Sequence, residues 1–168
     1  EKAANSVPEK ARSLEAGLAL MVDRVRTTSE QVGRRFPHWA DPATGRWTTT
    51  ASGDWPGGAW LGMLWCAIRL GKTEYRAFMR EWMSALKPQL EVHSAFRGFP
   101  FYYGCAVGDL LFADREAGEI AEDCARRLFA DFDDKLGLIP LGPGAEEGDR
   151  IGKDISSIDS LQATPLLY

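Results

Sequence analysis

The sequence AWLGMLWCAIRL, residues 59–70, decides the fold. Nearly every position is apolar, and the stretch makes about three helical turns but is too short to cross a bilayer. A helix that is apolar on every side is covered on every side, so this one belongs inside the protein. Residues 99–112 and 158–168 have the same character, and each carries a single charge, Asp109 and Asp159 respectively.

Amphipathic helices alternate with these apolar segments. Hydrophobic residues recur at helical spacing over residues 14–25, 75–86 and 117–128, and charged residues occupy the other faces. A charged face of this kind is typical of a helix that is exposed to water. The order predicts an all-α fold of helical hairpins with an inner and an outer layer, either an α/α toroid or an α-solenoid.

The connections between these helices differ in length. The turns that follow apolar helices are short, at residues 71–74 and 113–116, whereas residues 33–58, 92–98 and 133–157 form long connections that lead into apolar helices. If the inner helices run parallel, the three long connections lie at the same end of the fold, where function usually sits. This mouth would contain Trp47, Asp54, Trp55, Trp60, His93, Ser94, Arg97 and Asp159.

Composition limits the classes of function. The 168 residues, 45% of them hydrophobic, suit one domain over residues 1–168 with a sizeable core. A net charge of -4 without a basic stripe argues against nucleic-acid binding, and we find no signal peptide or membrane span, so we expect a cytoplasmic protein. Because Tyr168 ends the chain within an apolar run, we expect the domain to continue beyond it.

Cysteine and histidine give no sign of a metal site or a cofactor. Cys66, Cys105 and Cys124 lie in apolar helical contexts without metal-ligand spacing, so we expect three buried free thiols. His38, in the expected loop FPHW, and His93 are far apart and also lack ligand spacing. Phosphate and dinucleotide motifs are absent as well, and the glycines of residues 53–58 are interpreted as a turn into a helix.

Asp159 is a lone carboxylate at the start of the last apolar segment, in SIDSLQ. Two interpretations are open. Asp caps helix N-termini well, so Asp159 is a candidate N-cap. A carboxyl group that is buried among apolar residues has a raised pKa, which suits a general acid.

Four motifs resemble the unsaturated glucuronyl hydrolases and the related unsaturated rhamnogalacturonyl hydrolases. Residues 55–65, WPGGAWLGMLW, are similar to the family segment DWxxGFWPGMLWLA, and residues 158–168, IDSLQATPLLY, to IDxMMNLPLLYWA. Between them, Gly98 and Phe99 resemble the end of HDxGF, and residues 133–142 resemble GGFIQAWG. The order and the gaps match from about Trp47 to Tyr168.

The resemblance implies an (α/α)6 barrel, of which this chain would hold about half. It implies removal of a 4,5-unsaturated uronic acid from the non-reducing end of oligosaccharides made by polysaccharide lyases. In that chemistry an aspartic acid protonates C4, water adds at C5, and the hemiketal collapses to release the sugar. Asp159 matches the acid and Trp60 the sugar-stacking tryptophan, while Trp55, His93, Ser94 and Arg97 are expected to bind substrate. The open side of a half barrel would need the remaining half, or a second copy, to cover it.

One departure from the family pattern lies in HSAFRGF, residues 93–99. The second family aspartate of HDxGF falls on Ser94 when the histidines are aligned, and on Phe96 when the Gly-Phe pairs are aligned. Two alternatives to the family activity therefore remain: an acid/base reaction on another sugar, or a carbohydrate-binding or interaction module without turnover. Arg97 either binds a uronate carboxylate or is a solvated loop residue.

Overall fold

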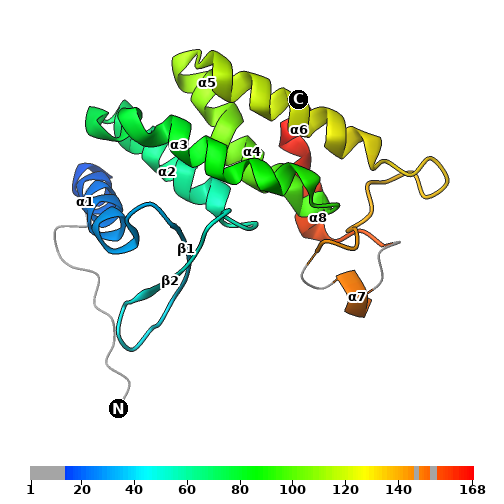
Figure 1. Ribbon diagram of the computed structural model, residues 1–168, viewed down its shortest axis with the longest axis horizontal. Helices are drawn as coiled ribbons and strands as arrows, with labels where there is room; N and C mark the ends of the chain where they lie inside the picture. The colour runs from blue at the N-terminus through cyan, green and yellow to red at the C-terminus, as the bar shows by residue number, and fades with distance from the viewer. Residues whose placement is uncertain (1–13, 146–147, 152–154) are drawn as a thin grey trace.

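A computed structural model describes residues 14–145, 148–151 and 155–168, and of residues 149, 151, 159 and 162 it describes the backbone alone. The predicted alternation of helices is present (Figure 1). The outer helices are α1 (Leu14–Val32), α3 (Arg76–Leu86) and α6 (Arg115–Ala130). The first inner helix is α2 (Gly57–Arg69).

The other two inner segments are less regular than the sequence suggests. The second consists of α4 (Gly98–Phe101), a π-helical turn (Tyr102–Ala106) and α5 (Val107–Phe112) in direct succession. The third is α8 (Ile158–Ala163), which continues as a 3₁₀ turn (Thr164–Leu167). Further 3₁₀ turns cover Thr73–Tyr75, Lys87–Glu91 and Ala95–Arg97, and α7 (Gly148–Ile151) lies in the last long connection.

Close backbone contacts hold the inner helices together. A methyl group on Gly58 of α2 would lie 2.5 Å from the carbonyl carbon of Pro100 in α4. A methyl group on Gly98 would likewise lie 2.7 Å from the Cβ atom of Ala163, where α4 crosses α8. Glycine at both positions lets the backbones touch, so α2, α4 and α8 form one packed inner layer.

The long connections lie together at one end of the helices, as the sequence predicts (Figure 1). Hydrogen bonds hold them there: the Ala95 amide donates to the Leu141 carbonyl at 3.0 Å, and Gln89 Nε2, in the 3₁₀ turn before the second connection, donates to Ser52 Oγ at 3.2 Å. The short turns lie at the other end, where Ala113 adopts a left-handed conformation and Asp114 caps α6.

The first long connection contains a β-hairpin that the sequence analysis did not predict. Strand β1 (Phe36–Ala40) pairs antiparallel with β2 (Trp47–Thr50), and a bulge lies between Pro37 and Trp39. Phe36 is fully buried and packs edge-on against Trp82 at 5.0 Å between ring centroids, which anchors the hairpin to α3. The expectation that His38 lies in a loop is therefore wrong, because it belongs to β1.

Residues 59–70 are not covered on every side. Met63 and Leu70 are 44% and 51% exposed, and with residues of α1 and the π-helical turn they line an apolar groove of about 830 Å³. Cys66 lines the same groove and is exposed, so its predicted burial is wrong. Cys105 and Cys124 are buried as expected, and burial raises the pKa of Cys124 to about 12. Among the described helices, none has the length and apolar character that a membrane span requires.

Candidate functional site

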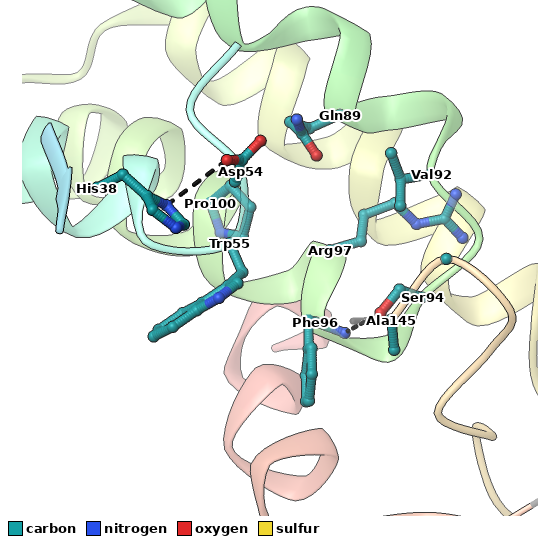
Figure 2. A pocket seen from close by; sticks show the side chains of 11 residues that line it. His38, Asp54, Trp55, Gln89, Val92, Ser94, Phe96, Arg97, Pro100 and Ala145 are labelled. Carbon is teal, nitrogen blue, oxygen red and sulfur yellow. Dashed lines mark hydrogen bonds and ion pairs between the residues drawn. The ribbon is translucent and has the colours of Figure 1, made fainter. Parts of the chain in front are cut away.

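A pocket of about 400 Å³ opens where the three long connections meet (Figure 2). The first connection contributes Asp54 and Trp55, and the second contributes Ser94 and Arg97. These four residues were expected at one mouth, and the structure brings them together. The remaining lining residues are His38, Gln89, Val92, Phe96, Pro100, Gly144 and Ala145.

A tight turn before α2 positions Asp54 and Trp55. The Gly53 amide donates to Thr50 Oγ1 at 3.1 Å, and the Gly57 amide donates to the Gly53 carbonyl at 2.6 Å. Asp54 itself has a left-handed backbone, with a φ of 37°. The turn holds the Asp54 carboxylate beside the imidazole of His38, with 3.5 Å between Oδ2 and Nδ1.

Trp55 and Trp60 have different environments. The Trp55 side chain is 52% exposed at the pocket, so its ring is accessible to a ligand. Trp60 is only 2% exposed and packs against Trp82 at 6.1 Å, which leaves little ring surface for a sugar. The sugar-stacking role predicted for Trp60 is therefore corrected to a packing role, and Trp60 and Trp47 line the apolar groove instead of this pocket.

Ser94 acts as a helix cap in the pocket wall. It is 2% exposed, and its Oγ accepts a hydrogen bond from the Phe96 amide at 3.1 Å at the start of the 3₁₀ turn Ala95–Arg97. The neighbouring His93 does not line the pocket. Its side chain is exposed, and its Nδ1 lies 3.3 Å from Oδ1 of Asp131, the residue at the C-terminal end of α6.

Arg97 is neither a free cation nor a solvated loop residue. Its side chain is 2% exposed, and its guanidinium forms an ion pair with Asp131. Nη1 donates to the Leu90 carbonyl and Nη2 to the Arg127 carbonyl, each at 2.9 Å. Figure 2 shows the side chain passing Val92 on the side of the pocket away from Asp54. Both expectations for Arg97 are thus corrected, because its charge is used to join the second connection to α6. Among the described residues its Nε has no hydrogen-bond partner.

Asp159 lies in the first turn of α8, but its side chain is outside the described residues. The N-cap of α8 is Ser157, whose Oγ accepts from the Ser160 amide at 3.3 Å, so the capping interpretation of Asp159 is wrong. The helix itself packs against the 3₁₀ turn that contains Arg97 and follows Ser94. The acid role of Asp159 stays a prediction.

Several pocket residues were missed by the sequence analysis. Gln89, Val92 and Pro100 carry no chemical signal in their sequence context. Gly144 and Ala145 form a wall because the Gly144 amide donates to the His93 carbonyl at 2.9 Å. His38 could have been found only if the hairpin that carries it had been predicted.

No family model matches the sequence, and no curated protein matches it. Solved structures do match. One is the crystal structure of unsaturated glucuronyl hydrolase, responsible for the degradation of glycosaminoglycan, from Bacillus sp. GL1, with 23% identity and a TM-score of 0.77. Another is a substituted UGL with dGlcA-Glc-Rha-Glc, with 22% identity and a TM-score of 0.77. Each match covers 89% of this chain and 40% of the other. The likeness confirms the all-α barrel expectation: this chain has the fold of these (α/α)6 barrels over 40% of their length.

Proposed function

We propose that this chain is part of a glycoside hydrolase that removes a 4,5-unsaturated uronic acid from the non-reducing end of an oligosaccharide. The observation that carries the proposal is the pocket, in which Asp54, Trp55 and Ser94 meet although they come from two separate connections. A half-exposed tryptophan beside a carboxylate is suited to sugar, because the ring stacks on the apolar face and the acid accepts hydrogen bonds from hydroxyl groups.

In the proposed reaction, Asp159 donates the proton to C4 of the substrate. Its helix α8 is held against α4 at the contact between Gly98 and Ala163, and α8 also packs against the 3₁₀ turn in the pocket wall. The resemblance of residues 158–168 to the family motif supports this role. Trp55 takes the stacking role, since its ring is accessible and that of Trp60 is not.

The same proposal accounts for the apolar groove, because the rest of the barrel would cover it. Met63 and Cys66 of the inner helix α2, together with Leu70 that follows it, form an exposed apolar stripe, and such stripes are normally covered. We expect further helical hairpins of the complete protein to cover this groove.

The test follows the absorbance of the conjugated double bond in the complete protein with unsaturated disaccharides of several uronyl types. We expect the absorbance to fall with the wild-type protein and to stay constant with Asp159→Asn. Constant absorbance with the wild type on every substrate would refute the hydrolase. Sugar binding under those same conditions would instead support a carbohydrate-binding module without turnover.

A further inference from the structure

The pocket has one acidic side chain among its described lining residues, that of Asp54. Neither Ser94 nor Phe96, the two residues that align with the second family aspartate, carries a carboxylate. Asp54 reaches the pocket from another connection, the turn before α2. Asp54 therefore supplies the carboxylate that neither Ser94 nor Phe96 provides.

The backbone at Asp54 is left-handed and firmly held. This conformation is uncommon for residues other than glycine, although aspartate adopts it more readily than most. The preceding Gly53 is closely packed, because a methyl group there would lie 2.8 Å from Leu86 Cδ1 and 3.1 Å from Phe36 Cδ1. The turn thus rests on the core, which fixes the backbone that carries the carboxylate.

The Asp54 side chain has little to do in the described structure. Its one described partner is His38, and the 3.5 Å between Oδ2 and Nδ1 is too long for a good hydrogen bond. The carboxylate is 42% exposed, so its oxygens are open to water or a ligand in the pocket. An exposed acid on a firmly held left-handed turn, with only a weak partner, is a candidate for chemistry.

We propose that Asp54 is the second catalytic carboxylate of this pocket, and that it acts as the base that activates water. The inference rests on the proposed hydrolase function. In the addition step, the Asp54 carboxylate takes a proton from water while the water oxygen forms a bond to C5. The electron pair of the C4–C5 double bond takes a proton from Asp159 at C4. Water is thereby added across the double bond, and one proton returns from Asp54 to Asp159 through solvent.

The deciding variant is Asp54→Asn in the complete protein, assayed with an unsaturated disaccharide. Asparagine tolerates the left-handed backbone as aspartate does, so the turn is retained. We expect kcat to fall about 100-fold or more, with KM within about threefold of wild type, because a base acts in the transition state. The matched control is Asp41→Asn in the hairpin loop, where Asp41 accepts hydrogen bonds from the Ala43 amide and the Thr44 hydroxyl and does not line the pocket. This control should keep the wild-type kcat.

Three results would overturn the inference, and they can be told apart. If the wild type is active and Asp54→Asn keeps kcat within about threefold, Asp54 is not the base, while the proposed function stands. If Asp54→Asn raises KM alone, Asp54 only binds substrate. If the wild type itself leaves the double bond intact, the proposed function fails and the role of Asp54 fails with it.

Discussion

Replacing Gly58 by alanine should strongly destabilise the protein, because this glycine is where α2 touches α4. The added methyl carbon would lie 2.5 Å from the carbonyl carbon of Pro100, whereas ordinary contact begins at 3.4 Å. The two helices must therefore separate by about 1 Å, the difference between these distances. Overpacking of a core costs about 1–3 kcal/mol. The same movement strains the buried 2.9 Å hydrogen bond from Trp65 Nε1 to the Gly104 carbonyl, at about 1–3 kcal/mol if it breaks.

We therefore expect Gly58→Ala to lower the free energy of unfolding by about 2–6 kcal/mol, the sum of the two contributions. The measurement is urea denaturation of the 168-residue chain followed by far-UV circular dichroism. The control is Gly17→Ala in α1, where a methyl group meets nothing within 4 Å and should stabilise the helix by about 0.5–1 kcal/mol. Equal midpoints for Gly58→Ala and the wild type would refute the close approach of α2 and α4.

Three further predictions concern burial. Trp55→Ala should raise KM for the sugar with little change in stability, whereas Trp60→Ala should cost about 3–5 kcal/mol of unfolding free energy in the denaturation assay. Arg97→Met should cost about 1–3 kcal/mol in the same assay, since it removes the ion pair with Asp131 and leaves that carboxylate only His93; an unchanged midpoint would contradict the Arg97–Asp131 ion pair. In the native 168-residue chain, a thiol reagent should label Cys66 and spare Cys124. Burial raises the folded-state pKa of Cys124 to about 12, so the contribution of its thiol to the free energy of unfolding is complete below pH 9 and decreases as the pH rises from 9 to 12. Denaturation at several pH values would detect this decrease.

Most of the helices could be predicted from local sequence patterns. The apolar character of residues 59–70 placed α2 inside, and the amphipathic spacing over residues 75–86 and 117–128 placed α3 and α6 outside. The hairpin was missed because the strand Phe36–Ala40 has no regular alternation: its bulge and Pro37 interrupt the pattern, and its stability comes from Phe36 packing on Trp82. That contact joins residues far apart in the chain, so no local pattern contains it.

The sequence by itself determined the alternation of inner and outer helices and the gathering of the long connections at one end, because periodicity and connection length are local properties of the chain. Only the tertiary structure decided which side chains face the pocket. In the folded chain Trp55 is exposed and Trp60 is buried, although both belong to one motif, and Arg97 forms an ion pair with Asp131. The tertiary structure also turned Asp54 toward the pocket through a left-handed turn that rests on Leu86 and Phe36. Exposure and direction depend on neighbours from other segments, and those neighbours are present only when the chain has folded.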